Sequence, residues 1–195
     1  MGKNRLEAFS DGVLAIILTI MVLEMKVPHG AGLDALRGVL PVFLSYVLSF
    51  VYVGIYWNNH HHMLHATTHV NGLVLWANLH LLFWLSLFPF VTGWMGENHF
   101  AALPSTVYGM VLFFAALAFW LLQHAIIRSQ GPDSPLARAV GRDWKGKTSL
   151  AAYAVGAPVA LVSPSVAQLL YIAVAILWLV PDRRIERTLA AHPHS

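Results

Sequence analysis

The 195-residue sequence contains no cysteine, and only 11% of its residues are charged. The absence of cysteine excludes disulfides, thiolate metal sites and cysteine nucleophiles. An ordinary soluble domain carries about 25% charged residues, so this chain has too few charges to cover a globule in water. A water-soluble enzyme is therefore excluded.

Long apolar runs take the place of the missing charges, since 57% of the residues are hydrophobic. A membrane-spanning helix needs about 20 apolar residues, and a lone strand in lipid would leave its backbone unpaired. The sequence therefore predicts an all-α polytopic membrane protein with six transmembrane helices in a single domain, residues 1–195. The expected spans cover about 6–25, 39–57, 70–94, 104–127, 148–162 and 165–180, and Pro89 is expected to kink the third.

The basic residues are distributed unequally between the two ends of such a bundle. One end would hold Lys3, Arg5, Arg128, Arg138, Arg142, Lys145, Lys147, Arg183, Arg184 and Arg187, and the other only Lys26 and Arg37. This asymmetry predicts a multi-pass protein of the inner (plasma) membrane with both termini cytoplasmic, and no nucleic-acid partner. For the basic loop from Arg128 to Lys147, specific binding of anionic lipid is the alternative to a topology signal.

The first apolar run has a polar beginning and a regular stripe. At 3.6 residues per turn the stripe lies within an arc of about 100°, and it comprises Gly12, Ile16, Thr19, Ile20 and Leu23. Asp11 points to nearly the opposite side. From spacing alone, ordinary lipid or helix contact explains this stripe as well as a functional face does. Asp11 is either hydrated at the interface or paired with a histidine or arginine of another helix.

The polar beginning of this run carries a family signature. The residues Arg5-x-x-x-Phe9-Ser10-Asp11 resemble the motif that opens the first helix of the endosomal and lysosomal potassium channel family and its bacterial homologues. Two further stretches are similar to that family, namely Tyr56-Trp57-Asn58-Asn59-His60-His61 at the end of the second span, and Asn78-Leu79 with Leu87-Phe88-Pro89-Phe90 in the third.

The resemblance implies a passive, potassium-permeable cation channel without catalytic residues or cofactors. Four six-helix units would form a homotetramer in the bilayer, with a pore lined by the first helix. The family pattern puts a hydrophobic constriction at Ile16, a contribution to selectivity at Thr19 and a second apolar ring at Leu23, with Gly12 and Ile20 beside them. It also implies a structural network, made of Arg5, Phe9, Ser10, Asp11, Trp57, His61 and Asn78.

The chain has no T-V-G-Y-G carbonyl filter. A ring of threonine hydroxyls replaces hydration only in part, so selectivity for potassium over sodium is expected to be weak to moderate.

Histidine is abundant, with eleven residues in the chain. On a helix His61, His65 and His69 would form one stripe that could bind zinc, copper or haem. However, there is no H-E-x-x-H, and no Asp or Glu lies between Arg37 and Glu97, so no metal ligand is assigned. The alternatives to a channel are a histidine-rich membrane metalloprotein for redox or metal transport, and a proton-coupled transporter that uses Asp11. His80 and His124, within spans, are expected to be satisfied core groups.

Overall fold

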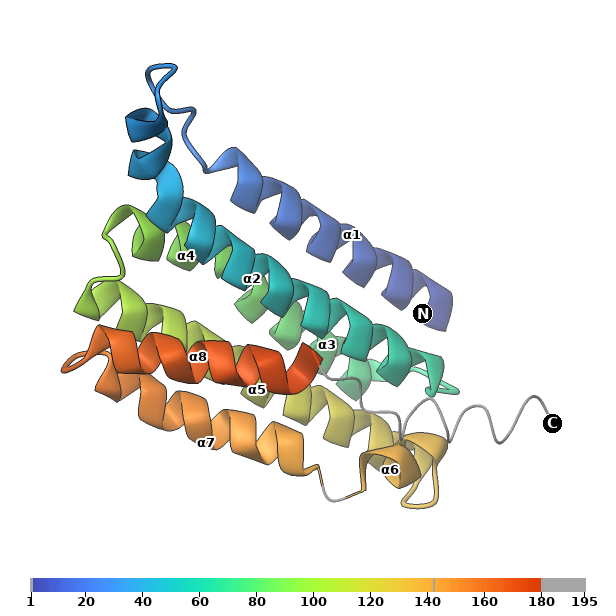
Figure 1. Cartoon of the computed structure of the whole chain (residues 1–195). Coiled ribbons are helices and arrows are strands. Elements are labelled where there is room, and N and C mark those ends of the chain that lie inside the picture. The colour runs from blue at the N-terminus through green and yellow to red at the C-terminus, as the bar shows by residue number, and fades with distance from the viewer. Residues whose placement is uncertain (1, 142, 180–195) are drawn as a thin grey trace.

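The computed structural model describes residues 2–141 and 143–179, and within them every regular element is a helix (Figure 1). The helices are α1 (Lys3–Leu23), α2 (Leu33–His65), α3 (Gly72–Ser86), α4 (Phe88–Glu97), α5 (Ala102–Gln130), α6 (Pro135–Val140), α7 (Trp144–Val159) and α8 (Pro164–Leu179). The predicted all-α class is confirmed.

Four helical segments are long and apolar enough to cross a membrane: α1, α2, α3 with α4, and α5. The third is interrupted at Leu87, because Pro89 lies in the first turn of α4 and has no N–H to continue the hydrogen-bond ladder. The kink expected at Pro89 is confirmed. Both α7 and α8 contain 16 residues, which gives a length of about 24 Å against about 30 Å for a bilayer core.

Helix α2 extends beyond the predicted second span of residues 39–57 at both ends. It begins at Leu33 and continues through Pro41, because the proline removes only one bond near the start of a 33-residue helix. It ends at His65, beyond the apolar segment, since Asn and His side chains are no obstacle to a helix that leaves the membrane. At about 50 Å, α2 is longer than a bilayer core.

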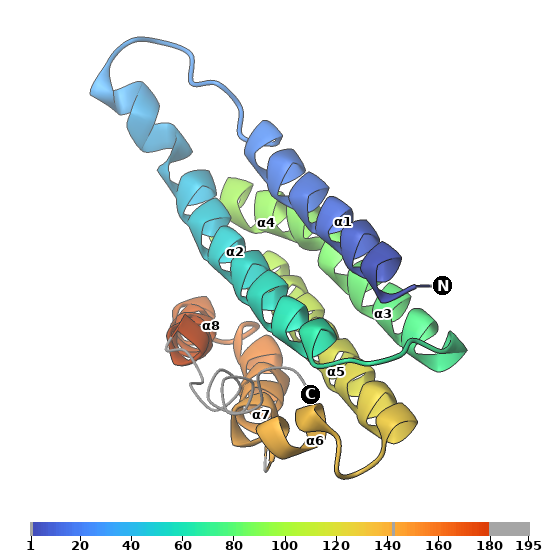
Figure 2. The ribbon, with the colours of Figure 1, turned by 90° about the vertical axis from the view of Figure 1, so that its right-hand side faces the viewer.

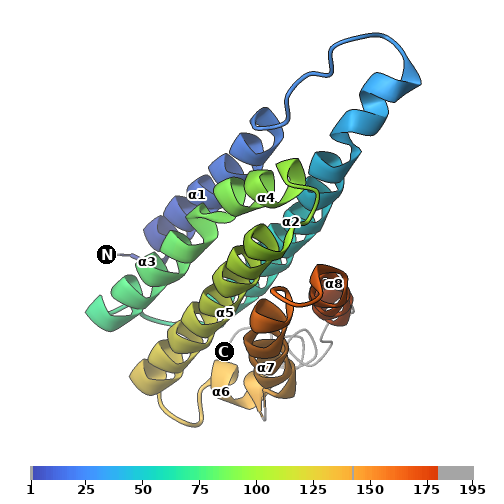
Figure 3. The same cartoon turned by 90° about the vertical axis from the view of Figure 1, so that its left-hand side faces the viewer.

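The helices divide into two sides of the subunit (Figure 2). Helix α1 packs on α2, α3 and α4, whereas α5 also contacts α7 and α8. Seen from the opposite direction, α6, α7 and α8 again lie away from α1 (Figure 3). The two sides pack against each other along α3 and α5. At one end of the bundle, Lys3 Nζ donates to His65 O at 2.9 Å within the α1 side, and His69 Nε2 donates to Ser129 O at 3.1 Å across the two sides.

Candidate functional site

Helix α1 has one packed face and one exposed face. The packed face consists of Leu6, Ser10, Leu14, Ile17 and Met21, all of them buried. The five residues of the stripe found in the sequence lie on the exposed face, where Ile16 has 60% and Leu23 75% of its surface accessible. Within residues 2–141 and 143–179, nothing covers this apolar face. Its side chains are therefore available to lipid or to another subunit.

Thr19 lies in the middle of the exposed face. Its hydroxyl donates to Ala15 O at 2.9 Å, one turn earlier in the same helix. This intrahelical bond occupies the hydroxyl proton, so the oxygen lone pairs are what Thr19 offers to water or to a cation. The stripe therefore presents one hydroxyl oxygen between the apolar side chains of Ile16 and Leu23.

A buried network fixes the packed face to two other helices. Ser10 Oγ donates to Leu6 O at 2.9 Å and accepts from Asn78 Nδ2 at 3.0 Å. Asn78 Oδ1 lies 2.7 Å from His60 Nε2. Because an amide oxygen only accepts, this nitrogen carries the proton and the network is directed from His60 through Asn78 to Ser10. It joins α2, α3 and α1 with three buried side chains.

A second, more exposed link joins α1 to α2. Trp57 Nε1 donates to Asp11 Oδ1 at 3.1 Å, and the Trp57 ring stacks on His61 with centroids 6.3 Å apart. His61 Nδ1 lies 3.0 Å from Glu7 Oε1. Asp11 and Glu7 are one helical turn apart, so both carboxylates meet the same side of α2. The partner of Asp11 is therefore an indole, where the sequence predicted a histidine, an arginine or water.

Only part of the network implied by the resemblance forms among the described residues of one subunit. Arg5 is exposed and its side chain makes no hydrogen bond or ion pair with any described residue, and Phe9 is about half exposed. His61 does not contact Asn78, because the preceding His60 occupies that place. The missed residues are His60 and Glu7. The spacing of four from buried Tyr56 to His60 is the signal that could have identified it.

The predicted three-histidine stripe does not form. His61 and His65 stack with ring centroids 6.2 Å apart, but α2 ends at His65 and His69 lies beyond it. Within residues 2–141 and 143–179, no three His, Asp or Glu side chains are grouped to hold a metal ion. His80 and His124 are exposed on their helices, which corrects the expectation that they are core groups.

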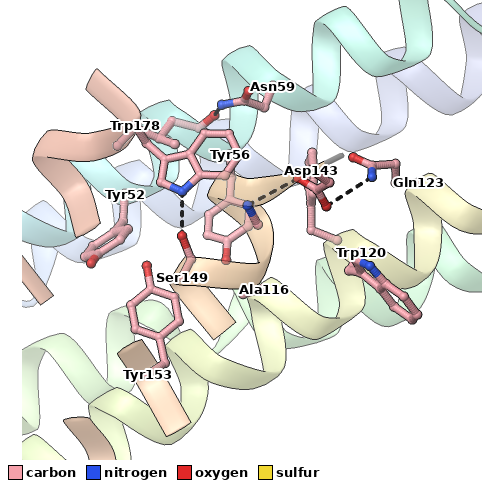
Figure 4. Close-up of a pocket in the computed structure, with 13 residues that line it drawn as sticks. Tyr52, Tyr56, Asn59, Ala116, Trp120, Gln123, Asp143, Ser149, Tyr153 and Trp178 are labelled. Atoms are coloured by element: carbon pink, nitrogen blue, oxygen red, sulfur yellow. Dashed lines mark hydrogen bonds between the residues drawn. The ribbon is translucent and has the colours of Figure 1, made fainter. Parts of the chain in front are cut away.

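A small pocket lies on the other side of the subunit, between α2, α5, α7 and α8 (Figure 4). Its walls are aromatic, and its polar bonds run from Trp178 Nε1 to Ser149 Oγ at 2.8 Å and from Gln123 Nε2 to Asp143 Oδ2 at 3.4 Å. The cavity measures about 50 Å³, whereas ligand sites measure about 300–1,000 Å³. It has room for water only, and α1 does not reach it.

Comparison with known proteins places this arrangement in a family. The sequence profile described as the endosomal/lysosomal potassium channel TMEM175 family matches residues 5–89, which contain α1, α2, α3 and the start of α4. A potassium channel of Chryseobacterium sp. strain P1-3 is 52% identical over 97% of this chain and 98% of that protein. This chain belongs to the TMEM175 family. It is therefore an ion-channel family member and not an enzyme.

Two further TMEM175 relatives extend the comparison. The Gallus gallus TMEM175, named an endosomal/lysosomal proton channel, is 32% identical over 73% of this chain and 32% of its own length. The crystal structure of a lysosomal potassium-selective channel TMEM175 homolog from Chamaesiphon minutus superposes with a TM-score of 0.79. That match covers 92% of this chain and 97% of the other at 24% identity, and it shows a shared fold.

Proposed function

We propose that this chain is a passive, potassium-permeable cation channel of the plasma membrane, formed by four copies around a pore lined by α1. The observation that carries the proposal is the exposed face of α1. Ile16, Thr19 and Leu23 follow helical spacing on this face, while the opposite face of the same helix is fully packed. One helix cannot enclose a pore by itself, so the proposal requires an oligomer.

In this arrangement Ile16 forms the gate. A ring of four isoleucine side chains excludes water when it is narrow, and a small rotation or tilt of α1 widens it. Thr19, nearly one turn further along, supplies hydroxyl oxygens that replace part of the hydration shell of an ion. This replacement is incomplete, so potassium is preferred over sodium only weakly to moderately. Leu23 narrows the pore again at its outer end.

The two links between α1 and its neighbours would hold the gate in position. The Ser10–Asn78–His60 network and the Asp11–Trp57 bond both act at the first half of α1, before Ile16. The half that carries Ile16, Thr19 and Leu23 is packed mainly by apolar contacts, with one weak bond from Thr92 Oγ1 to Met21 Sδ at 3.9 Å. A helix anchored at one end can change its tilt at the other, which is the movement that a hydrophobic gate needs.

We infer that all six hydrophobic segments cross the membrane as one domain, with both termini cytoplasmic. The described cations support this topology. Lys3, Arg5, Arg128, Arg138 and the start of α7 lie at one end of the bundle, and Lys26 and Arg37 at the other. The short helices α7 and α8 would span as a hairpin, with lipid thinning or flanking residues making up the difference in length.

Potassium flux into proteoliposomes tests the proposal, with sodium as the competing ion and empty vesicles as the blank. Ile16→Ala should increase the flux severalfold because it widens the apolar ring. Ile176→Ala is the matched control, since Ile176 on α8 is 57% exposed but lies far from α1. Thr19→Val keeps the side-chain shape, and it should lower the preference for potassium over sodium.

Three outcomes would contradict the proposal. Folded, inserted protein without flux above empty vesicles would remove the channel function. Equal flux in Ile16→Ala and Ile176→Ala would remove Ile16 from the pore. Movement of potassium or protons against a gradient, followed with a pH dye in the same vesicles, would indicate the proton-coupled transporter instead. Native mass spectrometry that found any stoichiometry other than four would correct the assembly.

A further inference from the structure

A groove much larger than the inner pocket lies where the chain leaves the bundle after α5. It measures about 380 Å³, which is within the range of about 300–1,000 Å³ for ligand sites. The end of α5 contributes Trp120, His124 and Ile127, α6 contributes Val140, and α7 contributes Lys147. The groove combines an apolar wall with polar groups at its rim.

The position of the groove determines what can enter it. Its walls come from the end of α5, from α6 and from the start of α7, and these elements lie at the basic end of the bundle on the side that faces away from α1 (Figures 2 and 3). If α1 faces a central pore, as proposed above, α5, α6 and α7 face the surrounding membrane. A groove at the end of a membrane-spanning helix is then at the depth of the lipid headgroups.

Two charged side chains border the groove, Lys147 and Asp143. Lys147 is exposed, and its side chain makes no hydrogen bond or ion pair with any described residue. The Asp143 carboxylate accepts bonds from Gly146 N at 3.2 Å and from Gln123 Nε2, which hold it toward the protein (Figure 4). The Lys147 ammonium is therefore the charged group available to a ligand, and it suits an anion. The surrounding segment, residues 128–147, contains five Lys or Arg and two Asp, a formal balance of +3.

His124 supplies a second polar group of defined character. Its Nδ1 lies 2.8 Å from Trp120 O, and its ring lies 3.9 Å from the Trp120 ring, centroid to centroid. A carbonyl oxygen only accepts, so Nδ1 carries a proton. In the neutral tautomer that this bond selects, Nε2 is an acceptor, which suits a hydroxyl group and not a phosphate oxygen.

From these observations we propose that the groove binds the headgroup of an anionic phospholipid that carries a free hydroxyl, such as a phosphoglycerol. Lys147 contacts the phosphodiester and His124 Nε2 accepts from the headgroup hydroxyl. Ile127 and Val140 pack against the glycerol backbone, while Trp120 lies at the interface as an aromatic anchor. A zwitterionic headgroup brings its own ammonium close to Lys147 and is disfavoured.

Quenching of tryptophan fluorescence by brominated lipid measures this site in the full-length protein. The protein is reconstituted in phosphatidylcholine with increasing brominated phosphatidylglycerol, and the relative affinity of the anionic lipid is fitted. Lys147→Gln should lower that affinity about fivefold, the effect of one cation near a membrane surface. Arg37→Gln is the matched control, because it removes one exposed cation at the opposite end. Trp120→Phe should remove the saturable part of the quenching.

The hydroxyl is tested separately with phosphatidylmethanol, which has the phosphodiester but no headgroup hydroxyl. Wild type should prefer phosphatidylglycerol, and His124→Phe, which keeps a ring beside Trp120 but has no Nε2, should lose this preference. An equal loss in Lys147→Gln and Arg37→Gln would reduce the effect to general charge and overturn the site. Competition by soluble glycerophosphate would overturn the membrane source in favour of a free phosphate.

This test is independent of the proposed function. Potassium flux of the same variants is measured in parallel, and Lys147→Gln should retain it because Lys147 is far from α1. If the wild type shows no flux but retains the lipid preference that Lys147→Gln loses, the channel proposal fails and the lipid site stands. If flux is normal and no preference exists, the lipid site fails alone.

Discussion

The first and last helices of the described chain are attached to the subunit in opposite ways. Helix α8 is held by close packing around Tyr171, which has no exposed surface. A Cβ at Gly156 would lie 2.8 Å from the Tyr171 ring, and one at Gly109 would collide with its hydroxyl. Tyr171 also donates to Ser105 O at 3.2 Å. Little space remains for α8 to move relative to α5 and α7.

Helix α1 is attached by directional bonds at one end and has an open face along its whole length. Its two polar links start at Ser10 and Asp11, and the apolar residues Ile16 and Leu23 point away from the subunit. The comparison teaches that the side around α5, α7 and α8, the closed side, is fixed by interlocked packing, whereas α1 is fixed by polar links at one end. Both α8 and α1 expose apolar side chains, for example Leu169 and Leu23. Under the proposed function, the α1 face is where a neighbouring subunit is expected.

The largest effect is expected from breaking the buried attachment of α1. Asn78→Leu leaves the His60 Nε2–H without an acceptor and Ser10 without a donor, at a cost of about 3 kcal/mol in unfolding free energy. Denaturant titration in detergent micelles measures this. The control is Asn58→Leu, an exposed position on α2 two residues before His60 and on the other side of the helix, with an expected change within about 0.5 kcal/mol. Equal losses in the two variants would show that the network does not stabilise α1.

Overpacking the closed side should have the next largest effect. Gly109→Ala forces a methyl group against the Tyr171 hydroxyl and should destabilise the protein by about 2 kcal/mol. Gly54→Ala on α2 meets no atom within 4 Å and should be neutral or stabilise by up to about 1 kcal/mol. In a Tyr171→Phe background the cost of Gly109→Ala should shrink, since the hydroxyl is gone. An unchanged cost there would assign the strain to another contact.

The exposed attachment of α1 should be weaker. Trp57→Phe keeps the ring beside His61 but removes the N–H that donates to Asp11, which should cost about 1 kcal/mol. The same variant should change potassium flux, because α1 loses one of its two anchors before Ile16. Trp76→Phe is the control, since Trp76 is 74% exposed on α3 and donates no hydrogen bond to the described residues. Identical flux in both variants would separate this bond from gating.

The smallest effect is expected at the opposite end, where Lys26 Nζ lies 2.7 Å from Glu97 Oε1. The Glu97 carboxylate raises the pKa of Lys26 above its ordinary value of 10.5. The raised pKa means that the ion pair stabilises the folded state while Lys26 is charged. This contribution is lost only as the pH rises above 10.5 and through the raised pKa of the folded state. Lys26→Gln should therefore leave stability at neutral pH nearly unchanged and flatten its decline in alkali. A marked loss at pH 7 would contradict this view of an exposed pair.

The sequence predicted the exposed face of α1 well, because one helical repeat of mostly apolar residues runs along that helix. The exposed stripe from Gly12 to Leu23 and the break near Pro89 both follow from local rules, namely helical periodicity and the missing proline N–H. The end of α2 was predicted less well. Residues 58–62 are five polar side chains in succession, and each of them could have faced Asn78. Local preferences cannot choose among them.

The sequence by itself determined that this chain lives in a membrane, since its few charges and long apolar runs allow no other solvent. It also determined the membrane orientation to be expected, which follows from the distribution of Lys and Arg. The exposed stripe of α1 follows from the helical rotation of about 100° per residue. Only the tertiary structure decided that His60 and not His61 meets Asn78, and that α5, α6 and α7 leave a groove beside Lys147. Those outcomes depend on how helices distant in sequence are placed against one another, and side-chain periodicity within one helix carries no information about that placement.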